Sequence, residues 1–184
     1  MRPGSLLLSP SAVTGTLLAL ALAGAPAQAQ NAPPGSREEL LMQFNNSASK
    51  FEALAAAMPA DKFSWSPGPG VMTVAHVYAH VARYNYGYLT QNMGVAAPRG
   101  IGLDTLERMT DKAQIVALLK SSAEFVRQNV RQMPEAQLSK QAELYGRNVP
   151  QWSVLLQLVA HMNEHLGQSI AYARMNGVVP PWSR

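Results

Sequence analysis

The amino-acid sequence predicts an all-α protein, a four-helix bundle whose helices are joined by both short and long connections. Four segments of about twenty residues each carry apolar side chains at intervals of three and four, the spacing of one helix face. Turn-forming residues separate these segments, and no stretch shows a convincing strand pattern. Helices of this length, each with one apolar stripe, bury the stripes by packing against one another.

The first residues have the pattern of a secretory signal peptide. Arg2 supplies a positive charge, residues 12–23 form an apolar run too short to span a bilayer, and residues 27–29 read Ala-Gln-Ala, a small-x-small cleavage site. We therefore expect residues 1–29 to be removed, leaving a secreted or periplasmic protein with no stable membrane insertion. Residues 30–35 are expected to be a flexible tail, and residues 36–184 to form one domain.

The first helix is expected between Ser36 and Pro59. Ser36 and Glu39 have the spacing of a capping box, and the proline ends the helical pattern. The apolar face consists of Leu40, Leu41, Phe44, Ala48, Phe51, Leu54, Ala55 and Met58.

The second helix is expected to begin after Thr73, a good N-cap residue, and to run to about Met93. A stretch rich in Ser, Pro and Gly, residues 64–70, precedes it as a turn. Residues 94–109 are interpreted as a long connection.

The third helix opens with Asp111 and Gln114 and stops before Pro134; residues 135–149 are interpreted as irregular. The fourth helix begins around Pro150 and ends near residues 176–177, an Asn-Gly pair. Two of the connections are long enough for crossovers, so the order in which the helices pack stays open.

The composition limits the chemistry that the protein can perform. The chain has no cysteine and four histidines, which excludes a disulfide framework, a thiolate nucleophile and a Cys-ligated metal. Any metal must be held by histidine, carboxylate or amide groups. The formal charge is only +4 and no Lys/Arg cluster is present, so the sequence does not favour nucleic-acid binding.

All four histidines fall in two pairs with a spacing of four residues, His76/His80 and His161/His165. One helical turn brings both imidazoles of a pair to the same side, where they can bind one ion. We take His80, His161 and His165 as the metal ligands. His76 is a possible fourth ligand or an outer group, because it falls at the third helical position after Thr73. The alternative is that the histidines only pack or cap.

Three further polar residues share the helix face of the histidines: Gln168, Tyr84 and Tyr172. Gln168 could contact a substrate or hold a ligand imidazole, and the tyrosines could polarise a substrate or act as general acids. An amide bonded across the bundle and tyrosines at the edge of the core are the structural alternatives. We treat the three as candidate catalytic residues.

The sequence resembles the DinB-like superfamily over about residues 36–182. The resemblance is carried by Trp65-Ser66-Pro67 with Gly70, by the segment from Thr73 to Asn85, by Gly177 with Pro180-Pro181, and above all by His161-Met162-Asn163-Glu164-His165-Leu166-Gly167-Gln168. It implies a four-helix bundle with a non-sequential connection and a divalent metal, commonly zinc or nickel. Carried over position by position, the implied ligands are His80, His161 and His165.

The resemblance also implies a range of functions. Relatives include thiol-dependent S-transferases and isomerases, in which the metal stabilises a thiolate of a small molecule. Activation of a bound water, in a hydrolase, is an equally reasonable use of the ion. A metal-binding module without catalysis, or a helical interaction protein, is the alternative from another class. Relatives are often dimers, so a homodimer is possible.

Overall fold

The computed structural model describes residues 32–183; the expected signal peptide, residues 1–29, lies outside them. Of the expected tail, residues 32–35 are described: the amide of Ala32 donates to Ser139 Oγ at 3.4 Å, and its side chain packs against the core. Among the described residues no helix is long and apolar enough to cross a membrane.

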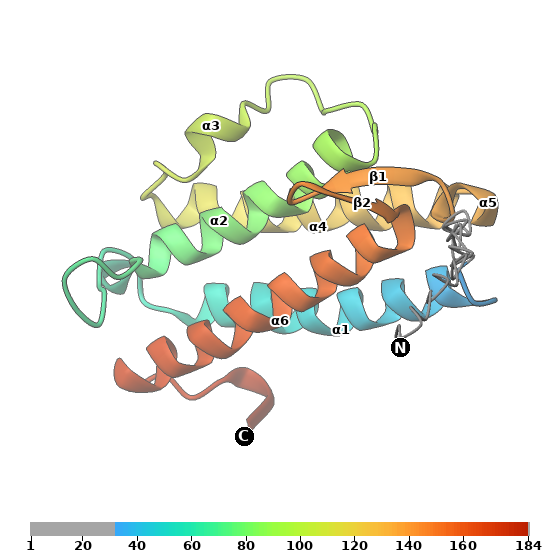
Figure 1. Cartoon of the computed structure of the whole chain (residues 1–184). Coiled ribbons are helices and arrows are strands. Elements are labelled where there is room, and N and C mark those ends of the chain that lie inside the picture. Colours follow the sequence, from blue (N-terminus) through green and yellow to red (C-terminus); the bar gives the residue numbers. More distant parts are fainter. Residues whose placement is uncertain (1–31, 184) are drawn as a thin grey trace, which may run out of the picture.

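Four long helices form a bundle, as predicted (Figure 1). They are α1 (Ser36–Ala57), α2 (Val74–Gly87), α4 (Lys112–Gln132) and α6 (Gln151–Met175), and a π-helical turn (Tyr88–Asn92) extends α2. The minor elements are α3 (Leu103–Leu106), α5 (Glu135–Leu138), the strands β1 (Gln141–Leu144) and β2 (Arg147–Pro150), and 3₁₀ turns at Ala60–Lys62 and Pro181–Ser183.

The helices are arranged non-sequentially. Both α1 and α2 pack against α4 and α6, so the order around the bundle is α1, α4, α2, α6. Figure 1 shows that α2 and α4 run in the same direction, so the chain between them must return along the length of the bundle. Residues 93–111 make this crossover, in the segment expected to be a long connection, and they contain α3.

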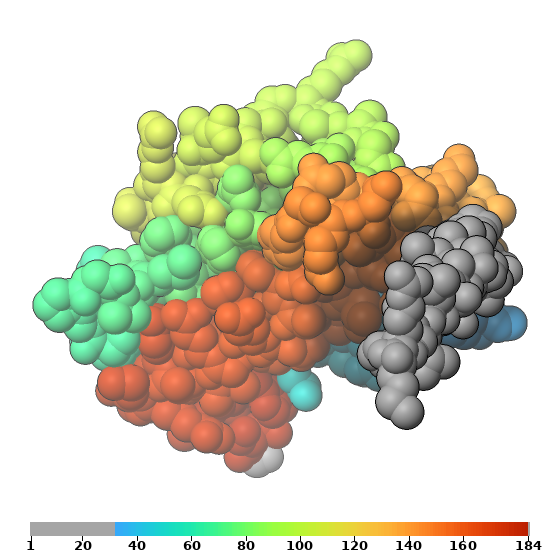
Figure 2. All heavy atoms as spheres, in the orientation of Figure 1, coloured from blue at the N-terminus to red at the C-terminus, as the bar shows by residue number. Residues whose placement is uncertain are grey.

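A two-stranded antiparallel hairpin, β1–β2, corrects the expectation that residues 135–149 are irregular and that the chain has no strands. Ala142 and Leu144 face the core while their neighbours in β1 are exposed. Tyr145 and Gly146 form the turn with φ values of 51° and 73°, a conformation that glycine adopts readily. Figure 2 shows the hairpin (orange) on the surface, between the green segment and α6 in red.

Side-chain caps define two of the helix starts as predicted. Thr73 Oγ1 accepts from the amide of His76 at 3.1 Å, which puts His76 at the third helical position. Asp111 accepts from the amide of Gln114 at 2.8 Å. The capping box expected at Ser36 is wrong: the N-cap is Gly35, and the Ser36 hydroxyl donates instead to the carbonyl of Pro33.

Candidate metal centre

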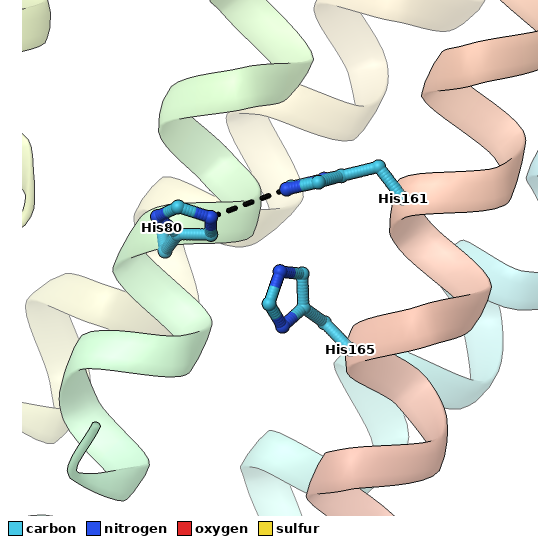
Figure 3. Close-up of side chains that lie close together, drawn as sticks. All are labelled: His80, His161 and His165. Carbon is cyan, nitrogen blue, oxygen red and sulfur yellow. Dashed lines mark hydrogen bonds between the residues drawn. The ribbon is translucent and has the colours of Figure 1, made fainter. Parts of the chain in front are cut away.

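Three of the four histidines converge between α2 and α6 (Figure 3). His80 extends from α2, and His161 and His165 extend from successive turns of α6. The ring centroids lie 5.1 Å apart for His80 and His161, 4.9 Å for His80 and His165, and 4.5 Å for His161 and His165. One nitrogen of each ring lies within 4.8 Å of the others, so the three could hold a metal ion.

The distance between two ring nitrogens matches what a shared ion requires. His80 Nε2 and His161 Nε2 are 3.2 Å apart. Two nitrogens that each lie about 2.0–2.1 Å from one tetrahedral ion are separated by about 3.3–3.4 Å. The helices therefore hold these two imidazoles near ligand separation.

Hydrogen bonds on the outer side of two rings orient them toward the cluster. His80 Nδ1 lies 2.9 Å from Glu107 Oε1, and His165 Nδ1 lies 2.7 Å from Gln168 Oε1. Both oxygens are acceptors, so each Nδ1 donates its proton and leaves a lone pair on Nε2. A carboxylate or amide on the outer nitrogen is the usual support of a metal-binding histidine.

Burial favours the neutral form of two of the imidazoles, His161 and His80, and neutral imidazole is the form that binds metals. His161 and His165 are 8% and 9% exposed. Burial, with the neighbouring His165 and His80, lowers the pKa of His161 to about 3. Burial also lowers the pKa of His80, and this outweighs the opposite effect of Glu107.

Glu107 is the residue of the site that the sequence did not reveal. It follows α3 in the crossover and receives His80 on Oε1 and His76 Nε2 on Oε2, the latter at 3.2 Å. Arg83 Nε lies 3.5 Å from Oε1. Burial acts to raise the pKa of Glu107, but the bonds from His76 and His80 and the charge of Arg83 together lower it. Glu107 therefore stays ionised.

His76 is not brought into the three-histidine cluster. Its side chain is 39% exposed and contacts Glu107, and with His80 and Glu107 it forms a separate group of possible ligands. The two histidines of α2 thus share one carboxylate but face different surroundings.

Two candidate catalytic residues, Tyr84 and Gln168, contact the cluster, and Tyr172 is linked to it through Gln168. Tyr84 packs between two histidines of the cluster, with ring centroids 4.6 Å from His80 and 4.5 Å from His161. Gln168 bonds His165 and donates from Nε2 to the hydroxyl of Tyr172 at 2.9 Å, an arrangement that suits the role of holding a ligand imidazole. Tyr172 is buried against Trp65, with ring centroids 5.3 Å apart.

Tyr88 is a further neighbour that the sequence did not single out. Its ring centroid lies 5.8 Å from that of His161, and its hydroxyl is 2.6 Å from the hydroxyl of Tyr145 in the hairpin turn. Burial and the bond to Tyr145 raise the pKa of Tyr88, so the phenol stays protonated. Tyr88 falls one turn after Tyr84, and this spacing was the signal that could have found it.

Solved structures with the same fold support this architecture. A DinB-like protein from Bacillus cereus ATCC 10987 has a TM-score of 0.68 and 19% identity, over 78% of this chain and 95% of that one. A mycothiol-dependent maleylpyruvate isomerase has a TM-score of 0.58 and 18% identity, over 76% of this chain and 61% of that one. The colibactin self-resistance protein ClbS, solved in complex with double-stranded DNA, has a TM-score of 0.57 and 12% identity, over 78% and 98%.

No curated protein matches the sequence. The family model of the DinB superfamily, however, matches residues 43–172, which run from within α1 to near the end of α6. The match covers most of the chain and includes all four histidines, in agreement with the fold and with the resemblance found in the sequence. The protein belongs to the DinB superfamily.

Proposed function

We propose that the protein binds one divalent metal ion, zinc or nickel, through His80, His161 and His165, and that it is a metal-dependent transferase or hydrolase. The observation that carries this proposal is the convergence of three imidazoles, of which His80 and His165 donate Nδ1–H to an outer partner and so keep the lone pair on Nε2. Three histidines are the ligand set of zinc sites that keep a position for a further ligand.

A divalent ion in such a site lowers the pKa of a thiol or water that binds to it and so supplies a nucleophile at neutral pH. The chain itself supplies the surroundings. Because it contains no cysteine, the sulfur in any thiol chemistry must belong to the substrate. Tyr84, which packs on two of the ligands, and Gln168 and Tyr172, which are linked by a hydrogen bond, are the groups placed to orient a small molecule.

Metal analysis of the purified protein tests the proposal. Wild type should contain one divalent ion per chain after gentle purification, and His161→Ala should contain none. Wild type without stoichiometric metal would overturn it. A metal-loaded protein with no activity toward thiol or hydrolysable substrates would instead favour a binding module without catalysis.

We also propose that a small molecule, and not a nucleic acid, is the partner, and that the protein works outside the cytoplasm. The modest charge, the buried cluster and the pattern of residues 1–29 support this. Although ClbS was solved with DNA, its identity to this chain is 12%. A gel-shift experiment with double-stranded DNA should show no complex, and fractionation of expressing cells should place the processed chain in the periplasm or medium.

A further inference from the structure

Glu107 brings together a second set of metal-binding groups, on the solvent side of His80. Its two oxygens lie 2.9 Å from His80 Nδ1 and 3.2 Å from His76 Nε2. One donor atom of each of the three residues lies within 4.8 Å of the others, and all three side chains are partly exposed. A small ion from solvent can therefore approach this group.

We propose that His76, Glu107 and the outer nitrogen of His80 form a second divalent-cation site, which we call the outer site. It rests on the proposed function, because the ion held by His80, His161 and His165 in the inner site uses Nε2 of the same ring. The two nitrogens of an imidazole point in different directions, so His80 can bind one ion on each side.

The donor set suits zinc. Two histidines and one carboxylate occur as the protein ligands of zinc sites with an open position. An ion in the outer site takes the place of the proton that His80 Nδ1 now donates to Glu107, and that proton leaves to solvent. The carboxylate and the deprotonated ring then balance the two positive charges of the ion.

Two nearby cations make the outer site the weaker one. The inner ion repels a second ion, and Arg83, with Nε 3.5 Å from Glu107 Oε1, competes for the carboxylate. Arg83 already has a second partner, since its guanidinium carbon lies 4.7 Å from the centroid of the Tyr84 ring. The guanidinium of Arg83 can therefore leave the carboxylate of Glu107 when an ion binds there and still pack on the ring of Tyr84.

Filling the outer site changes the inner one. The ion removes the hydrogen bond between His80 and Glu107 that orients the inner ligand. Zinc in excess therefore acts on the inner site through a shared residue.

Titration of the metal-free full-length protein with Zn²⁺, followed by calorimetry and equilibrium dialysis, tests the proposal. Wild type should bind two ions, the second at least tenfold more weakly. His76→Ala should bind only the tight ion, and His161→Ala only the weak one. Asp104→Asn, which removes an exposed carboxylate of α3 at a distance of three residues from Glu107, is the matched control and should still bind two.

The outcomes separate the outer site from the proposed function. One tight ion in wild type, lost in His161→Ala and kept in His76→Ala, would overturn the outer site while the proposed function stands. Two ions in His76→Ala would also overturn the outer site. A tight ion that His76→Ala loses and His161→Ala keeps would overturn the proposed function together with the shared arrangement. If His161→Ala does not fold, the number of ions bound by His76→Ala still shows whether the outer site exists.

Arg83→Gln provides an independent test. Removal of the competing charge should tighten the weak ion severalfold and leave the tight ion within twofold of wild type. An unchanged or weakened second ion would show that it does not bind at Glu107 and would overturn the assignment.

Discussion

The two histidine pairs have the same spacing in the sequence but different surroundings in the structure. On α6 both members, His161 and His165, are buried and face α2. On α2 only His80 faces the cluster, whereas His76 lies at the first turn and contacts Glu107 of the crossover. A four-residue spacing therefore places two imidazoles on one side of a helix, but the elements packed against that side decide which of them can share an ion.

The largest expected effect is the contrast between the two histidines of α2. His80→Ala should weaken the tight metal ion by more than about a hundredfold, because it removes one of three ligands. His76→Ala should leave the affinity for the tight ion within a fewfold of wild type. Competition with a chelator of known affinity measures both.

Circular dichroism of each variant is the control, since loss of fold would also release the ion. Equal loss of metal in the two variants would show that the two histidines of α2 are equivalent and that the contrast drawn from their contacts is wrong.

The outer partners of the ligands should differ in strength. Glu107→Gln keeps the size of the side chain but removes its charge, and should weaken the tight ion by about 10- to 100-fold. Gln168→Leu, which removes a neutral partner from His165, should weaken it by about tenfold or less. A larger loss in Gln168→Leu than in Glu107→Gln, in the same chelator competition, would reverse the ranking of the two partners.

Acid should destabilise the metal-free protein through the buried cluster. The pKa of His161 is about 3 in the folded state and about 6.5 when unfolded, so between these values only the unfolded chain takes up the proton. The free energy of unfolding should therefore fall as the pH falls below about 6.5, by up to about 1.4 kcal/mol per pH unit. The lowered pKa of His80 acts in the same direction.

Urea unfolding at pH 7, 6 and 5 measures this slope, and the lowered pKa of Glu107 acts in the same direction at the acid end of the range. His161→Ala should show a flatter dependence. The same slope in both proteins would mean that His161 is protonated in the folded state.

The smallest effect is expected at the start of α2. Thr73→Ala removes the side-chain cap beside His76 and should cost about 1 kcal/mol of unfolding free energy. The affinity for the tight ion should not change, because His80 lies a full turn further on. Asp111→Ala removes the corresponding cap of α4 and should cost a similar amount; a selective loss of metal in Thr73→Ala would show that the cap positions the site.

Much of the fold could be predicted from the sequence, because the spacing of apolar residues shows where the helices lie and the capping residues show where they begin. Thr73 and Asp111 cap as expected, and the four apolar faces form the core. The hairpin was missed because its strands have four residues each and Val149 is their only β-branched residue. The polar and apolar residues alternate in β1, Gln-Ala-Glu-Leu, and this alternation before Gly146 was a weak signal of a strand.

Of the site, the sequence predicted the cluster of His80, His161 and His165, because helix phase places the side chains without knowledge of the loops. It could not predict Glu107, which lies 27 residues from His80 in a segment with no regular phase to connect the two. The sequence set His76 apart from these three because it falls at the third helical position after Thr73, but it could not show the contact of His76 with Glu107.

The three clustered histidines and the carboxylate of Glu107 behind them belong to parts of the molecule that differ in how well they tolerate changes of sequence and length. The histidines lie on helices whose neighbouring residues form the core, so their positions are fixed by packing. Glu107 lies in the segment that returns between two parallel helices, where most residues are at least partly exposed. Such a segment can change in length and sequence at little cost to the bundle. Exchange of residues 93–111 between members of this fold would keep the three histidines and alter what lies behind them, so the crossover is where the surroundings of the proposed metal site can change without rebuilding the core.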